Sequence, residues 1–103
     1  MSAIKGVLEE ELSASRRLLD LYERELAKLP EGTVVSRRIK GRDYYYRAHR
    51  EGKKVVTDYL GRLSAVDVAK AQEEKKKKKE YRRLIAEVKY QIRFLERSLK
   101  YGR

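Results

Sequence analysis

The chain contains few residues that could carry out acid–base or nucleophilic chemistry. His49 is the only imidazole among 103 residues, and there is no cysteine. No serine lies in the Gly-x-Ser-x-Gly turn that positions the nucleophile of many hydrolases. Too few His and Cys residues are present for a metal site, and Glu51-Gly52-Lys53-Lys54 lacks the glycine spacing and hydroxyl of a phosphate-binding loop. We therefore expect no enzyme, no catalytic residue, no metal or cofactor, and no small-molecule substrate.

The charge of the chain points instead to a polyanionic partner. The 27 lysines and arginines exceed the 16 acidic residues, for a formal net charge of +11. Residues 1–30 carry a net charge of −1, residues 31–63 carry +5, and residues 64–103 carry +7. Because a one-sided cationic field concentrates polyanions, this uneven distribution favours nucleic acid as the partner. The alternative is a basic surface with no particular ligand.

The spacing of apolar residues changes along the chain and predicts three kinds of element. A period of three to four predicts helices over residues 4–29 and 64–101, with Ser64 as N-cap of the second. Between them, a period of two predicts a β-meander over residues 33–60, with turns at Gly41-Arg42 and Glu51-Gly52. We expect an α+β fold that forms a single unit over residues 1–103.

Alternation along the strands divides the meander into two faces. The first is largely apolar and is expected to pack on Val66, Val68, Ala69 and Ala71 of the second helix. Its members are Val35, Arg37, Ile39, Tyr44, Tyr46, Ala48, Val55, Thr57 and Tyr59. The second face is basic and is expected to be exposed. On it we predict nucleic-acid contacts by Arg38, Lys40, Tyr45, Arg47, His49 and Lys54.

Five consecutive lysines, Lys75, Lys76, Lys77, Lys78 and Lys79, lie in the second predicted helix. Five residues turn through about 500° of a helix, so these side chains surround it rather than line one groove. They are predicted to add phosphate contacts without sequence preference. A solvated helix segment explains the run equally well, since lysine is a good helix former.

Both predicted helices carry heptad seams, which are typical of helix pairing. We predict that the seams form an antiparallel coiled-coil hairpin or an oligomeric bundle, and we expect a homo-oligomer such as a dimer. The residues assigned to self-association are Leu8, Leu12, Leu19, Tyr22 and Leu26, together with Ile85, Val88, Ile92, Leu95 and Leu99.

The stretch from Lys40 to Gly61, with Asp43-Tyr44-Tyr45-Tyr46-Arg47 and Tyr59-Leu60-Gly61, resembles a pattern in some transposases and short bacterial and phage proteins. With the following helix, it also resembles the three-stranded-sheet DNA-binding domains of phage-type integrases, over roughly 40 residues. In those domains the sheet enters the major groove. The resemblance implies that Arg38, Arg47 and Lys54 contact DNA.

We therefore expect a non-enzymatic protein that binds double-stranded DNA through the basic sheet face, with DNA preferred over RNA. Two alternatives stay open: a protein–protein adaptor or inhibitor that acts through the helices, and an RNA-binding protein with Tyr44 to Tyr46 as a stacking platform. The first residues form no apolar signal core, and no run approaches the ~20 apolar residues of a membrane span. We expect a cytoplasmic protein, associated with the nucleoid if it binds DNA, and no membrane partner.

Overall fold

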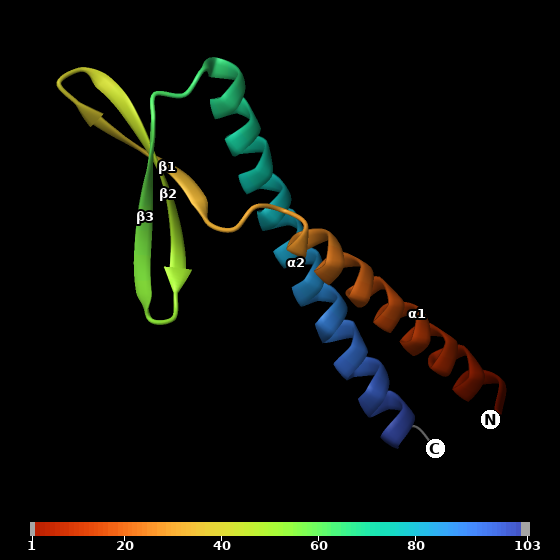
Figure 1. Ribbon diagram of the computed structural model, residues 1–103. Helices are drawn as coiled ribbons and strands as arrows, with labels where there is room; N and C mark the ends of the chain where they lie inside the picture. Colours follow the sequence, from red (N-terminus) through yellow and green to blue (C-terminus); the bar gives the residue numbers. More distant parts are fainter. Residues whose placement is uncertain (1, 102–103) are drawn as a thin grey trace. The chain divides into compact units, whose positions relative to one another are not determined.

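The computed structural model describes residues 2–101. In chain order they form a helix, a three-stranded antiparallel sheet and a second helix. The strands pair in the order β1-β2-β3, which confirms the expected α+β architecture. The elements are α1 (Ser2–Ala27), β1 (Thr33–Ile39), β2 (Arg42–Glu51), β3 (Lys54–Gly61) and α2 (Ala65–Tyr101) (Figure 1). None of the helices in the described part is long and apolar enough to cross a membrane.

The chain divides into two compact units. The helical unit combines α1 with the part of α2 that begins at Lys78. The sheet unit spans Leu29–Lys77 and therefore contains the meander and the first part of α2.

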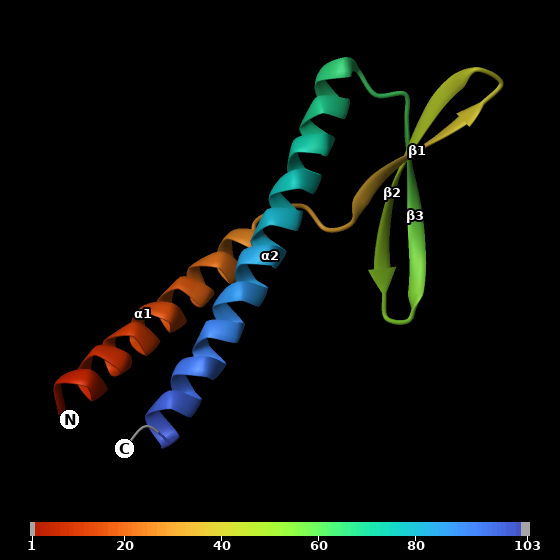
Figure 2. The same ribbon diagram turned by 180° about the vertical axis from the view of Figure 1, so that it is seen from behind.

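The helical unit is an antiparallel hairpin whose two helices run side by side in both views (Figures 1 and 2). Leu12 and Leu95 are the buried apolar residues of this hairpin. Ser15, which belongs to the same heptad seam as Leu12, is also buried. Tyr22 of α1 contacts Tyr81 of α2, with ring centroids 6.2 Å apart. Arg16 donates a hydrogen bond across the hairpin to Glu96, at 3.0 Å. The heptad spacing thus predicted the seam correctly.

The seam residues assigned to self-association are used within one chain. Leu8, Leu19, Ile85 and Val88 are half-buried along the hairpin, as are the other members of the two seams apart from the buried Leu12 and Leu95. A heptad pattern specifies that a helix needs a partner but not that the partner belongs to another copy. Here the meander reverses the chain direction, so that α2 supplies the partner for α1.

Both turns of the meander lie one residue from their predicted positions. The first is Lys40-Gly41, because Ile39 pairs with Arg42, and both turn residues have positive φ, as a type I′ turn requires. The second is Gly52-Lys53, because Glu51 pairs with Lys54. Moving a two-residue turn by one position shifts the pairing by two residues. The predicted partners were therefore wrong, but the assignment of each side chain to a face stays the same.

Two local features, a β-bulge near the end of β3 and a helix cap, lie where the sheet leads into α2. The pairing shifts between Tyr45 and Tyr46: Tyr46 pairs with Tyr59, Tyr45 pairs with Gly61, and Leu60 is the extra residue of a bulge. Beyond it, the Ser64 hydroxyl accepts a hydrogen bond from the backbone N–H of Asp67, at 3.1 Å. Ser64 is thus the N-cap of α2, as predicted.

Candidate nucleic-acid interface

One face of the meander packs against the first part of α2, and we call it the covered face. Tyr45, Val34 and Ser36 line a small hollow together with Val68, Ala71, Gln72 and Lys75 of α2. By strand alternation, the same face carries Arg38, Asp43, Arg47, His49, Glu51, Lys54, Val56 and Asp58. This corrects the sequence analysis, which expected the opposite face to meet the helix: the centre of this face, at Val34, Ser36 and Tyr45, lies beside α2, while Arg38 and Lys54 are exposed as expected.

Arg47 shows why a basic face can lie against a helix. Its guanidinium donates a hydrogen bond to the backbone oxygen of Glu31, at 3.1 Å, and lies 4.0 Å from the carboxylate of Glu74 on α2. On the same face, a ring nitrogen of His49 lies 3.0 Å from a carboxylate oxygen of Asp58. Each of these side chains therefore has a partner within the sheet unit.

The other predicted contacts are spread over different surfaces. Arg38, Lys40 and Lys54 are exposed, with Lys40 in the β1–β2 turn. In the lysine run, Lys78 is only 8% exposed, and Lys75 lines the hollow beside Tyr45. The remaining three, Lys76, Lys77 and Lys79, are exposed. The run thus surrounds the helix, as its spacing predicted, and does not form one groove.

Further along α2, Arg83 is occupied by acidic neighbours on its own helix. It donates hydrogen bonds to Glu80 and to Glu87, the latter at 2.6 Å. The bond from Arg83 lowers the pKa of Glu80, and the pKa of Arg83 is raised in turn. Because all three groups lie on one solvated helix, the pairs add little to stability but neutralise Arg83.

The opposite side of the meander, which we call the tyrosine face, carries a cluster of three aromatic rings. Tyr46 of β2 contacts Tyr59 of β3, with centroids 5.3 Å apart, and Tyr44 lies 6.4 Å from the same ring. The guanidinium of Arg37 on β1 lies over the Tyr46 ring, 5.6 Å from its centroid. By alternation, the face consists of Thr33, Val35, Arg37, Ile39, Arg42, Tyr44, Tyr46, Ala48, Arg50, Val55, Thr57 and Tyr59.

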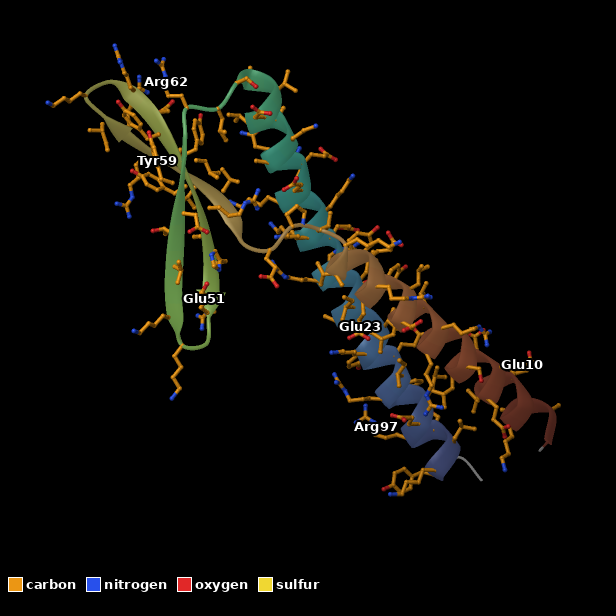
Figure 3. All side chains as sticks on the ribbon, viewed as in Figure 1. Glu10, Glu23, Glu51, Tyr59, Arg62 and Arg97 are labelled. Atoms are coloured by element: carbon orange, nitrogen blue, oxygen red, sulfur yellow. The ribbon has the colours of Figure 1, made fainter. Side chains whose placement is uncertain are left out.

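The tyrosine face is exposed at its apolar positions. Tyr59 keeps 60% of its surface accessible and Val55 keeps 63%. Ile39 and Val35 are also exposed, while Tyr44 and Tyr46 are half-buried by their neighbours. Figure 3 shows Tyr59 on β3, well away from Glu51 at the β2–β3 turn. Exposed aromatic and branched side chains that lie together on one surface are typical of a binding site.

The charges of the sheet divide unequally between its faces. The tyrosine face has three arginines, Arg37, Arg42 and Arg50, and no acidic residue at any strand position that points to it. The acidic residues within the strands, Asp43, Glu51 and Asp58, all alternate to the covered face. The positive charge of the tyrosine face is therefore uncompensated by its own strands, which favours an anionic ligand.

Four residues of this surface, Arg37, Arg42, Arg50 and Tyr59, were not among the contacts predicted from the sequence, whereas Tyr44 and Tyr46 were named there as part of a stacking platform for RNA. The sequence analysis placed Arg37 and Tyr59 on the face expected to meet the helix, placed Arg42 in a turn, and assigned Arg50 to neither face. Alternation alone nevertheless shows that all three strand carboxylates lie on the face opposite Arg37, Arg42 and Arg50, because moving a two-residue turn by one position does not change the faces. In the part of the chain that the structure describes, no three His, Asp or Glu side chains gather as metal ligands would.

The fold and this surface define an α+β protein in which helices flank a meander that has one helix-packed face and one exposed aromatic face. Residues 8–71, which span most of α1, the whole meander and the start of α2, match the family DUF6788, described as a domain of unknown function. The chain belongs to that family. No curated protein and no solved structure matches it.

Proposed function

We propose that the protein is a non-enzymatic nucleic-acid-binding protein and that the tyrosine face is its binding surface. The observation that carries this proposal is the combination, on one exposed face, of three clustered tyrosines and three arginines with no acidic residue. Arginine binds phosphates through several donors, and an aromatic side chain contacts sugars and bases. A solvated sheet face has no need to collect these residues and to send every strand carboxylate to the opposite side.

The test compares two triple variants that each remove three positive charges. One is R37Q/R42Q/R50Q on the tyrosine face, and the other is R38Q/K40Q/K54Q, at sites that the sequence analysis favoured. Binding of the full chain to labelled duplex DNA, single-stranded DNA and RNA is measured by fluorescence anisotropy at low salt. We expect the first variant to lose at least about tenfold in affinity and the second to lose much less.

Circular dichroism of both variants checks that the fold is kept. Equal losses would overturn the tyrosine face as the site, because general charge would then explain the binding. No binding of the unmodified chain to any of the three probes would overturn the function itself. Capture of a protein partner in that case would support the adaptor alternative.

The helical unit carries a second part of the proposal, self-association of two copies. Outside the seam, Tyr90 and Phe94 of α2 are exposed and line a hollow with Gln91, Leu95 and Glu11. Residues 9–11 of α1 are three exposed glutamates, whereas the last part of α2 carries Lys89, Arg93 and Arg97. Figure 3 shows Glu10 on α1 and Arg97 on α2. A second copy packed on this surface would bring opposite charges together, so it is the occupant that the charge pattern favours.

Sedimentation equilibrium over a range of protein concentrations tests this part. We expect the unmodified chain to form dimers, and we expect the single variant F94S to shift the equilibrium toward the monomer. A chain that stays monomeric at every concentration would overturn self-association and leave the nucleic-acid proposal unaffected.

A further inference from the structure

We infer that the tyrosine face binds an unpaired nucleic-acid strand, with bases stacked on Tyr44, Tyr46 and Tyr59 and phosphates held by the arginines. This inference rests on the proposed function and specifies its ligand. It departs from the duplex DNA that the sequence analysis expected.

The first reason is the exposure of ring surface. Tyr59 keeps most of its surface accessible, although it contacts both other rings of the cluster. The rings are tilted by 34° for Tyr44 and 52° for Tyr46 relative to Tyr59, so that they do not cover one another face to face. Each ring therefore has surface left over for a further aromatic partner, and an offset or tilted partner is the arrangement that aromatic rings prefer.

The second reason is that a duplex does not expose the faces of its bases to a protein. In a duplex the faces of the bases are stacked on one another, and only their edges are reached from the grooves. An unpaired strand presents base faces, and their stacking on aromatic side chains adds to the affinity that phosphate contacts provide. The apolar side chains around the rings, Val35, Ile39 and Val55, would likewise be covered by bases and gain nothing from phosphates.

The third reason is the position of the arginines. Arg42 and Arg50 lie near opposite ends of β2, at most roughly 27 Å apart at about 3.4 Å per residue of straight strand, with Tyr44 and Tyr46 between them. Arg37 lies over the Tyr46 ring from the neighbouring strand. A backbone that follows β2 would thus meet a cation near each end of the face while its bases turn toward the rings. Because every base has an aromatic face, we expect little sequence preference.

The experiment compares strand forms and replaces the rings without changing the charge. Labelled oligo-dT and oligo-U of about 12 nucleotides, and a duplex of the same length, are titrated with the full chain. The variant Y44L/Y46L/Y59L keeps apolar side chains on the face, and the single variant Y59L guards against loss of the fold. Y101L is the matched control, since Tyr101 is 73% exposed and lies outside the sheet.

We expect the single strands to bind at least about tenfold more tightly than the duplex. Y59L should weaken single-strand binding about fivefold or more, the triple variant should weaken it further, and Y101L should not change it. The two single-stranded probes show whether the strand is DNA or RNA. Tighter binding of the duplex, or single-strand binding that the tyrosine variants leave unchanged, would overturn this inference while the proposed function stands. No binding to any probe would overturn both.

Discussion

Tyr45 and Tyr46 are neighbours in the chain and belong to opposite surfaces of the sheet unit. Tyr45 lines a hollow together with Val68 and Ala71 of α2, whereas Tyr46 contacts Tyr59 on the exposed side. The pairing of β2 with β3 shifts between these two residues. Their separation divides the sheet into a face that holds it against the helix and a face that is free to bind, and the proposed function depends on this division.

Gly32, just before β1, is expected to tolerate no side chain. Its φ is +81°, and a Cβ there would clash with the backbone oxygen of Ala48 and lie 3.0 Å from the Cβ of His49. Gly41 has a similar φ of +79° but open space around it. In urea denaturation we expect G41A to cost about 1 kcal/mol from backbone strain and G32A at least about 2 kcal/mol. Equal costs would contradict the close approach of Gly32 to β2.

Lys40 is expected to be a suboptimal residue for its turn. Its φ of 52° lies in the left-handed region, which Asn adopts more readily than Lys. We expect K40N to raise the free energy of unfolding by up to about 1 kcal/mol. K53N, in a turn position without positive φ, should give no such gain. A K40N variant that is less stable than the unmodified chain would argue against the type I′ turn.

Ser64 is expected to stabilise the start of α2 through its cap. The S64A variant removes the acceptor of the Asp67 N–H and should lower the free energy of unfolding by about 1 kcal/mol. S64D should restore most of it, because an aspartate oxygen also accepts this bond. Thermal or urea denaturation followed by circular dichroism measures both, and equal stability of S64A and S64D would exclude the cap as the cause.

Much of the fold could be predicted from the period of the sequence alone. The spacing of Leu8, Leu12, Ser15 and Leu19 predicted which side of α1 is buried, and alternation divided the strand residues that it assigned into the same two sets that the pairing shows. Turn positions were harder, because Lys40 occupies a left-handed position that local propensity disfavours. Because moving a two-residue turn by one position leaves every side chain on its face, the error in turn position did not change the assignment of the faces.

The choice of the covered face could not be made from apolar content. The tyrosine face is the more apolar of the two, but its rings contact one another and need no helix to do so. The covered face carries Arg47, which finds partners in Glu31 and Glu74 only after the chain has folded. Such partners, distant in sequence, decide which face meets the helix.

The salt dependence of binding tests the central claim most directly. The logarithm of the binding constant for a single strand falls linearly with the logarithm of salt concentration, with a slope of about −0.7 for each phosphate contact. If Arg37, Arg42 and Arg50 each hold a phosphate, the slope for R37Q/R42Q/R50Q should be shallower by about 2 than that of the unmodified chain, while R38Q/K40Q/K54Q should keep nearly the full slope. Identical slopes for the unmodified chain and R37Q/R42Q/R50Q would contradict phosphate binding by the tyrosine face.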